Sequence, residues 1–177
     1  MNLDHRIRYL MNKEKLRVFT KITALLNSKG INASDTDFSR PWGGFFVIDL
    51  RDNSADNFIN SFYPELKDEF ASTNLPLSPK ILCIAPEKRL SWQYHHRRSE
   101  YWKLIDGVAG YIKSDTDGQT VVHHMVMNKT LILKQGERHR LVGLHDWGII
   151  AEIWKHTMPD HPSDENDIVR LQDDFGR

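Results

Sequence analysis

From Lys80 onward the chain is divided into short runs of β-forming residues, and this pattern constrains the fold more than any other feature. Eight such runs recur at intervals of about ten residues, and turn-forming residues separate several of them, as in SDTDGQ at 114–119. The runs are KILCIA, LSWQYH, EYWKLID, VAGYIKS, TVVHHMVM, KTLILK, RHRLVG and WGIIAEIW. Strands of this length and spacing predict an all-β fold, either a sandwich or a barrel.

The first part of the chain has a different period. Over residues 4–28, apolar side chains recur at spacings of three, four and seven, which predicts an amphipathic helix packed on the main body. These positions are Ile7, Leu10, Met11, Val18, Phe19, Ile22, Leu25 and Leu26. Gly30 provides the left-handed residue that often ends a helix.

Between this helix and the β runs, the pattern is weaker. We expect residues 31–45 to be irregular, because SRPWGG contains a proline and two glycines. VIDL at 47–50 is a candidate strand, and residues 53–70 predict a weak helix that is broken at Pro64.

Charge and cysteine content exclude several classes of protein. The 24 basic and 24 acidic residues balance, so net charge gives no support for binding nucleic acid or an anionic membrane. No segment approaches the roughly 20 apolar residues needed to span a bilayer. Cys83 is the single cysteine, which excludes a disulfide within the chain and is typical of a reducing compartment. The expectation is a soluble cytoplasmic protein.

The segment LSWQYHHRRSEYW at 90–102 concentrates side chains that bind metals and transfer protons. Alternation along a strand places Gln93 and His95 on one face, and Glu100 follows at the start of the next run. His139 lies about forty residues later in GERHRLVG. Together they would supply two nitrogen and two oxygen ligands to a divalent ion. If the strand kinks, His96 would replace His95.

Several segments resemble the cupin superfamily, and within it the type II mannose-6-phosphate isomerases. LSWQYHHRRSEYWKLIDG is similar to the first cupin motif and LKQGERHRLVG to the second. The resemblance covers residues 40–46 and 80–177 and leaves out residues 1–39 and 51–79. The family-like segments, in order, are RPWG, KILCIAPEKRLSWQ, HRRSEYW, HRL and DENDIVRLQDDFGR.

This resemblance implies a cupin double-stranded β-helix, a jelly-roll barrel, with a metal at its centre. It also implies an isomerase module without the nucleotidyltransferase domain that often precedes it. Residues 1–39 would then form an N-terminal helical extension and 40–177 the cupin domain, with the barrel core at about 80–155 and a tail at 156–177.

The resemblance further implies the interconversion of an aldose and a ketose phosphate, with mannose 6-phosphate and fructose 6-phosphate as the first pair. Zinc is the expected ion, with manganese, iron, cobalt and nickel as alternatives. Four positions depart from the family pattern, and they leave the sugar open. They are Lys134, Gly143, Arg97 and Trp154, the last of which replaces a glutamine.

Further residues are assigned roles in this reaction. Glu152 is an additional inward acid that would either move the proton or orient His95 or His139. Arg98, at the rim on the 96–99 connection, is the first candidate for binding the phosphate. Arg40 and Lys88 are weaker candidates for the same role. Lys103 is expected on the surface, and Arg170 and Arg177 are expected to form ion pairs that hold the tail.

Three other functions stay open. The first is an isomerase or epimerase of another sugar, and the second is a non-catalytic cupin that binds a sugar or a metal. The third is an iron oxygenase, which Gln93 disfavours because such sites usually combine histidines with a carboxylate. The expected partner is a small sugar phosphate, and a homodimer is left open.

Overall fold

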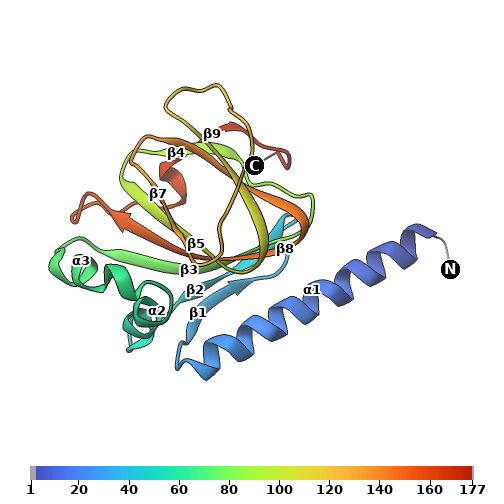
Figure 1. The fold of residues 1–177 in the computed structure, drawn as a ribbon, viewed down its shortest axis with the longest axis horizontal. Helices are drawn as coiled ribbons and strands as arrows, with labels where there is room; N and C mark the ends of the chain where they lie inside the picture. The colour runs from blue at the N-terminus through green and yellow to red at the C-terminus, as the bar shows by residue number, and fades with distance from the viewer. Residues whose placement is uncertain (1–2, 177) are drawn as a thin grey trace.

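A continuous sheet that curls into a barrel forms the body of the molecule (Figure 1). The computed structural model describes the backbone of residues 3–176 and the side chains of residues 13–176. The strands are β1 (Ala33–Asp37), β2 (Gly43–Ile48), β3 (Leu77–Ile84), β4 (Trp92–His95), β5 (Arg98–Ser114), β6 (His123–His124), β7 (Thr130–Leu133), β8 (Arg138–His156) and β9 (Ile168–Gln172). Their order is β1-β2-β3-β8-β4-β9, and β5 pairs with β6, β7 and β8. The predicted all-β barrel is confirmed.

Two pairs of predicted runs are each one long strand. EYWKLID and VAGYIKS are joined in β5, and RHRLVG and WGIIAEIW are joined in β8. The register between these strands shifts at Leu104/Asp106 and Gly107/Ala109. Gly107 has a φ of 71°, and a Cβ there would lie 1.8 Å from the Trp147 carbonyl oxygen. The bulges and this glycine let two long strands bend around the barrel without ending.

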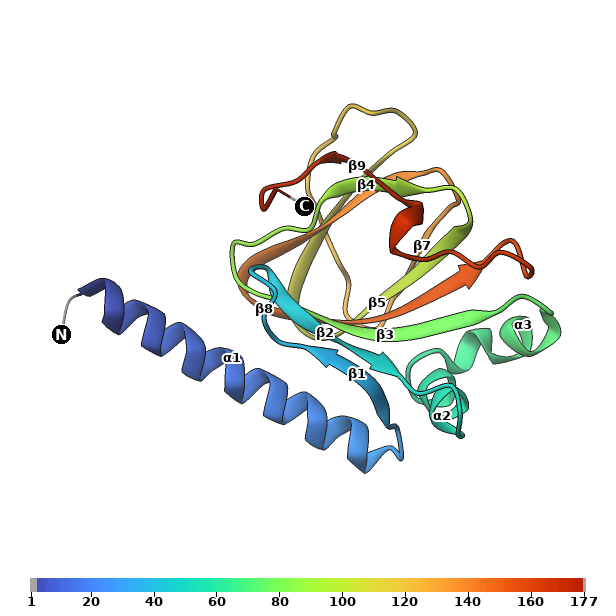
Figure 2. The ribbon, with the colours of Figure 1, turned by 180° about the vertical axis from the view of Figure 1, so that it is seen from behind.

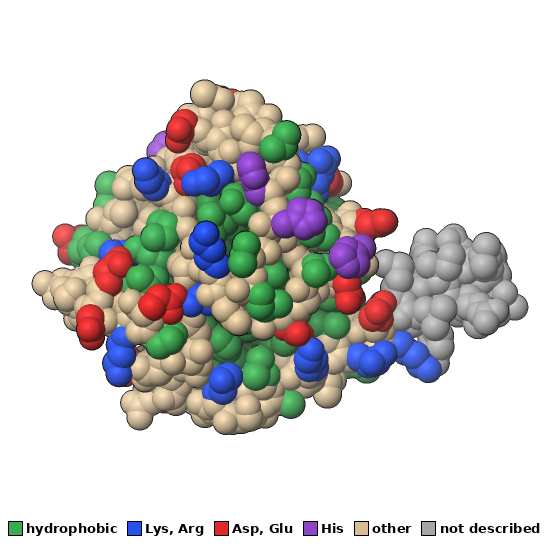
Figure 3. Space-filling model, viewed as in Figure 1, with side chains coloured by type: hydrophobic (Ala, Val, Ile, Leu, Met, Phe, Trp, Pro, Cys, Tyr) green, Lys and Arg blue, Asp and Glu red, His purple; other side chains and the backbone are tan. Residues whose placement is uncertain are grey.

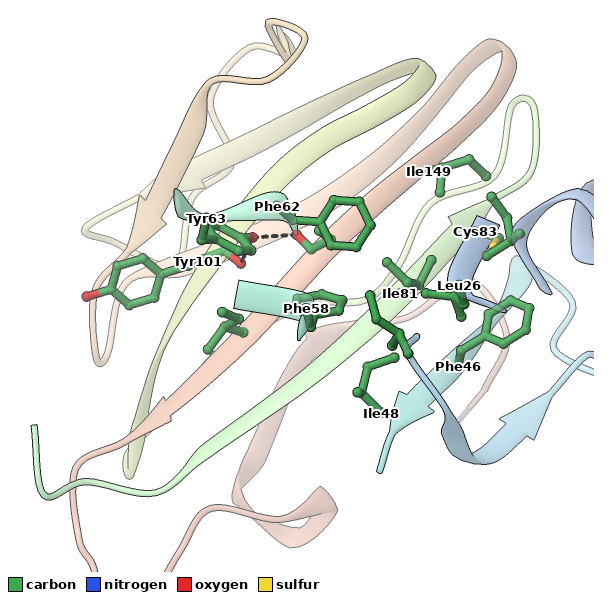
Figure 4. Packing of buried hydrophobic residues seen from close by; sticks show 14 of the residues in the cluster. Leu26, Phe46, Ile48, Phe58, Phe62, Tyr63, Ile81, Cys83, Tyr101 and Ile149 are labelled. Carbon is green, nitrogen blue, oxygen red and sulfur yellow. Dashed lines mark hydrogen bonds between the residues drawn. The ribbon is translucent and has the colours of Figure 1, made fainter. Parts of the chain in front are cut away.

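Alternation along the strands separates two apolar cores. On β3, Leu82 and Ile84 point into the barrel, while Ile81 and Cys83 point outward. The outer core is covered by helices, and Figure 4 shows part of it around Phe46, Phe58 and Tyr63. The Tyr63 hydroxyl lies 2.9 Å and 2.7 Å from two backbone carbonyl oxygens, one on β5 and one on β8. This contact attaches the helical layer to the outside of the sheet.

The helices are α1 (Leu3–Ser28), α2 (Ser54–Phe62), α3 (Lys67–Ser72) and two short 3₁₀ turns, η1 (Pro64–Leu66) and η2 (Glu165–Asp167). They confirm the predicted helix at 4–28 and the break at Pro64. In both ribbon views, α1 extends beyond the barrel toward its N-terminus (Figures 1 and 2). Phe19, Ile22 and Leu26 are buried. The apolar positions expected at Ile7, Leu10 and Met11 lie outside the described side chains.

Two strands contradict the sequence prediction. Residues 31–45 are not irregular, because β1 and the start of β2 lie there and pair with each other. The sheet therefore crosses the boundary expected after residue 39. β9 pairs with β4, although residues 156–177 were expected to form only a tail outside the barrel. β1 has the sequence ASDTD and is mostly exposed at the edge of the sheet, so it lacks the apolar alternation that reveals a strand.

The surface agrees with the balanced composition. Acidic and basic side chains are interspersed over the face in Figure 3. None of the helices in the described residues is both long and apolar enough to span a bilayer.

Candidate active site

A cavity of about 90 Å³ lies inside the barrel, and polar side chains converge on it. Register explains the convergence, because residues opposite each other in paired strands point to the same side of a sheet. Lys80 on β3 is opposite Glu152 on β8, and Glu152 is opposite Trp102 on β5. The neighbouring row pairs Trp154 with Glu100. All five residues line the cavity.

Three ligand-type side chains meet at one point of this interior. The ligand atoms of His95, Glu100 and His139 all lie within 4.8 Å of one another, and each residue is at most 2% exposed. His95 Nε2 is 3.1 Å from Glu100 Oε1, and His139 Nε2 is 3.4 Å from Glu100 Oε2. The two Nε2 atoms are 3.3 Å apart. His96 is exposed, so His95 is the member of the pair that faces inward.

The chemistry of these donors fits a divalent ion. His139 Nδ1 lies 2.9 Å from the Glu137 carbonyl oxygen, to which it can donate, and this tautomer leaves the Nε2 lone pair free. Burial lowers the pKa of His95 to about 4 despite the neighbouring Glu100, so its imidazole is neutral at pH 7. Glu100 Oε2 is buried without a hydrogen-bond partner among the described residues. Two imidazoles and a carboxylate are a common set of metal ligands.

Gln93 lies beside this group but presents its amide nitrogen to it. Gln93 Nε2 is 3.4 Å from His95 Nε2, while its Oε1 accepts a hydrogen bond of 2.6 Å from the Ser91 hydroxyl. A half-turn of the amide would bring the oxygen to the three ligands. Gln93 therefore stays a prediction as the fourth ligand.

Arg98 is buried, so the prediction that it lies at the rim is wrong. It is 1% exposed and is the first residue of β5, which points it inward together with Glu100. Its guanidinium donates to Glu100 Oε1 at 2.8 Å and to the Ser163 hydroxyl at 2.7 Å. Burial would raise the pKa of Glu100, but Arg98, His95 and His139 together hold it well below its usual value. Arg98 thus stabilises the ionised form of Glu100 and connects it to the tail.

Glu152 is a buried acid that can exchange its proton near neutral pH. Its side chain is 4% exposed, and Oε1 accepts a hydrogen bond of 3.0 Å from Trp102 Nε1. Burial, followed by the charge of Glu100, raises the pKa of Glu152 to about 7 against the opposing effect of Lys80 and Arg98. Among the described residues, neither His95 nor His139 hydrogen-bonds to Glu152. The alternative orienting role therefore has no contact to support it.

Sequence reasoning missed Lys80, which lies on the same strand face as Leu82 and Ile84. Its ammonium is 3.2 Å from the centroid of the Trp154 ring. Burial lowers its pKa, and Glu152 partly offsets this effect. The alternation in KILCIA could have revealed Lys80, because a lysine two residues before an inward leucine must also point inward.

The other basic candidates lie farther from the centre. Arg40 lines the cavity, but its Nε is 2.8 Å from Asp37 Oδ2 and the side chain is 41% exposed. Lys88 lies between β3 and β4 and is not among the residues that line the cavity. Arg170 Nη2 is 3.6 Å from Glu165 Oε2, in agreement with the expected ion pair in the tail. Arg177 lies outside the described residues.

A family model matches a region of the chain that the sequence motifs covered only in part. The family model described as mannose-6-phosphate isomerase C-terminal matches residues 52–173. This range includes most of the segment at 51–79 that the motifs had left out. The chain is 24% identical over 139 residues to the xanthan biosynthesis protein XanB of Xanthomonas campestris pv. campestris (strain B100). The match covers 78% of this chain but only 23% of the length of XanB.

Solved structures of oxalate decarboxylases share the fold. A mutant of Bacillus subtilis oxalate decarboxylase OxdC superposes with a TM-score of 0.55 at 13% identity, covering 80% of this chain and 32% of that chain. The Lactobacillus farciminis oxalate decarboxylase formate complex gives 0.52 at 16% identity, covering 79% and 34%. Another structure of the Bacillus subtilis enzyme, described by its Mn(II) centers, gives 0.53 at 14% identity, covering 80% and 32%. At these identities the likeness shows the cupin β-barrel fold alone.

Proposed function

This chain belongs to the mannose-6-phosphate isomerase C-terminal family, and from that premise we propose that it is a metal-dependent aldose–ketose isomerase of a sugar phosphate. One observation carries the proposal. The buried acid Glu152 and the ligand group of His95, Glu100 and His139 belong to the interior of the same barrel. Mannose 6-phosphate and fructose 6-phosphate are the first pair to test.

The residues divide the reaction between them. His95, Glu100 and His139, with Gln93, would hold a divalent ion, which when bound stabilises negative charge on the substrate oxygens. Glu152 in its ionised form takes a proton from the carbon next to the carbonyl and returns it to the neighbouring carbon. A pKa of about 7 suits both steps, because the acid and the base are both populated near neutral pH.

A shorter sugar phosphate is the second candidate substrate. Ligand cavities are typically about 300–1,000 Å³, so the cavity of about 90 Å³ is small for a hexose phosphate. Trp154 lines the cavity at the position where the family pattern has a glutamine, and its larger ring occupies space there. The lining side chains would have to move to admit a longer substrate.

The test is an isotope experiment on the metal-loaded protein. Elemental analysis first identifies the ion, for which zinc is expected and manganese, iron, cobalt and nickel are alternatives. Mannose 6-phosphate, fructose 6-phosphate and shorter aldose phosphates are then incubated in D₂O and followed by NMR. We expect conversion of at least one aldose–ketose pair, with deuterium at C1 or C2. If no sugar phosphate is converted and none gains deuterium, the protein is not an isomerase, and the non-catalytic binding function becomes the better explanation.

A further inference from the structure

Lys80 carries a positive charge for which the barrel provides no anionic partner in contact. Among the described residues its ammonium makes no hydrogen bond and no ion pair, and its close contact is the Trp154 ring at 3.2 Å. The Phe45 ring is farther away, at 6.0 Å. An ammonium has three hydrogen-bond donors and no acceptor, and a half-buried one is costly to leave unpaired. Lys80 therefore lines the cavity with unused donors.

Trp154 holds this ammonium in place. The Arg98 guanidinium carbon is 3.5 Å from the same ring centroid. Lys80 comes from β3 and Arg98 from β5, which are the two strands on either side of β8, so the two cations approach the indole from opposite sides. Each gains a cation–π attraction, and the ring keeps the two charges apart. The ammonium is thus positioned by a packed ring before any ligand binds.

Other donors in the same cavity are also unused. Within the described part of the chain, Trp154 Nε1 and Trp42 Nε1 are buried without hydrogen-bond partners, and these residues are 8% and 3% exposed. Both line the cavity with Lys80. Buried N–H groups normally have partners, so several unpaired donors around one charged group favour a ligand rich in acceptor oxygens. A phosphate group has such oxygens and a negative charge that Lys80 would balance.

The remaining basic residues are less suited to this role. Arg98 is committed to Glu100, Ser163 and His95. Arg40 is paired with Asp37, and Lys88 does not line the cavity. Arg140 and Arg170 also line it, but Arg140 donates to the Gln172 carbonyl oxygen and Arg170 pairs with Glu165. Lys80 is also the direct cross-strand neighbour of Glu152, so an anion bound to it lies beside the proposed base.

We propose that Lys80, positioned by the face of Trp154, binds the phosphate of the substrate and selects phosphorylated over unphosphorylated sugars. The assignment rests on the proposed function for the identity of the ligand, and it replaces Arg98 as the phosphate-binding residue. Lys80 is a binding residue, while Glu152 carries the proton.

The experiment measures binding to the metal-loaded protein by calorimetry. Mannose 6-phosphate, inorganic phosphate and free mannose are the probes, and Lys80→Met is the main variant. Methionine fills a similar volume without a charge, so the barrel should fold. We expect affinity for both phosphate probes to fall about tenfold or more, because the variant loses a hydrogen bond between charged groups. Affinity for mannose should not change. Lys80→Arg should restore most of the binding of mannose 6-phosphate.

Controls keep the outcomes distinct. Lys67→Met removes an exposed lysine of α3 and should bind all probes as the wild type does. Lys80→Gln serves as the second neutral variant if Lys80→Met does not fold. Unchanged phosphate binding in a folded neutral variant, an equal loss for mannose, or no binding of any phosphate probe to the wild type would each overturn the assignment. If Lys80 controls phosphate binding but no sugar is isomerised, the isomerase proposal fails and the assignment of Lys80 stands.

Discussion

Replacing Glu152 with glutamine should stabilise the metal-free protein and abolish most of the proposed isomerase activity of the metal-loaded protein. Glutamine has nearly the same shape, and its amide oxygen can still accept the hydrogen bond from Trp102 Nε1. What changes is the charge, because glutamine never ionises. The variant therefore removes the cost of an ionised carboxylate in the barrel and, with it, the group that would carry the proton.

The size of the effect follows from the pKa of Glu152. Burial and Glu100 raise it from 4.5 to about 7, which at about 1.4 kcal/mol per pKa unit corresponds to about 3 kcal/mol. The native state binds this proton more tightly than the unfolded chain. Its stabilising contribution is therefore complete below pH 4.5 and is lost as the pH rises through 7. Relative to the wild type, the variant should gain up to about 3 kcal/mol between these limits.

Urea unfolding of both chelated proteins at several pH values between 4.5 and 8 measures this difference directly. Chelation removes the pH dependence that a bound ion would add. For the metal-loaded variant, we expect kcat to fall by about 10²-fold or more while metal content stays the same. A stability difference that is constant across this pH range would refute the raised pKa, and an unchanged kcat would refute the catalytic role.

Glu65 provides a control of opposite sign. Glu65 forms an ion pair with Lys103, and Lys103 is only 4% exposed. Burial would raise the pKa of Glu65, but the hydrogen bond from Lys103 helps to lower it below its usual value. Its contribution is therefore present above pH 4.5 and is lost as the pH falls. Glu65→Gln should destabilise the protein at pH 7 and have less effect at pH 4.

Two further substitutions test the site and the helical layer. His139→Ala should lose most of the bound metal in elemental analysis, because it removes one of three buried ligand-type side chains. His123→Ala, which changes an exposed histidine of β6, should keep the metal. Full metal content in His139→Ala would exclude His139 as a ligand. Tyr63→Phe should lower the free energy of unfolding by about 1–3 kcal/mol, because it leaves two buried carbonyl oxygens without their hydroxyl partner. An unchanged midpoint of urea unfolding would show that this contact contributes little.

Period-two alternation explains what could be predicted from the sequence. It identified β3 and placed His95 and Glu152 inside, because strand geometry alone decides which side chains share a face. The alternation did not predict burial correctly for side chains whose burial depends on elements outside the sheet. Lys103 was expected on the surface, yet it is buried, because helices cover the outer face of the sheet and Glu65 pairs with it. The positions of those helices are not encoded in the strand pattern.

The position of Arg98 depended on contacts that are remote in sequence. An arginine near two histidines and a turn is usually exposed, since an isolated guanidinium is costly to bury. Here Ser163, 65 residues away, and Glu100 supply its partners, and Trp154 packs against it. Strand β9 was missed for the same reason, because its position depends on the long tail folding back onto β4.

The charges around the cavity suggest why a metal and a phosphate would bind together. The charged side chains that line the cavity include the acids Glu100 and Glu152 and the bases Arg98 and Lys80. Glu100 is already paired with Arg98, whereas Lys80 has no ion-pair partner among the described residues. A divalent ion would add positive charge beside Glu100, and a phosphate on Lys80 would return negative charge to the same cavity. Because buried charges are stable only when balanced, each ligand should raise the affinity for the other by the same factor.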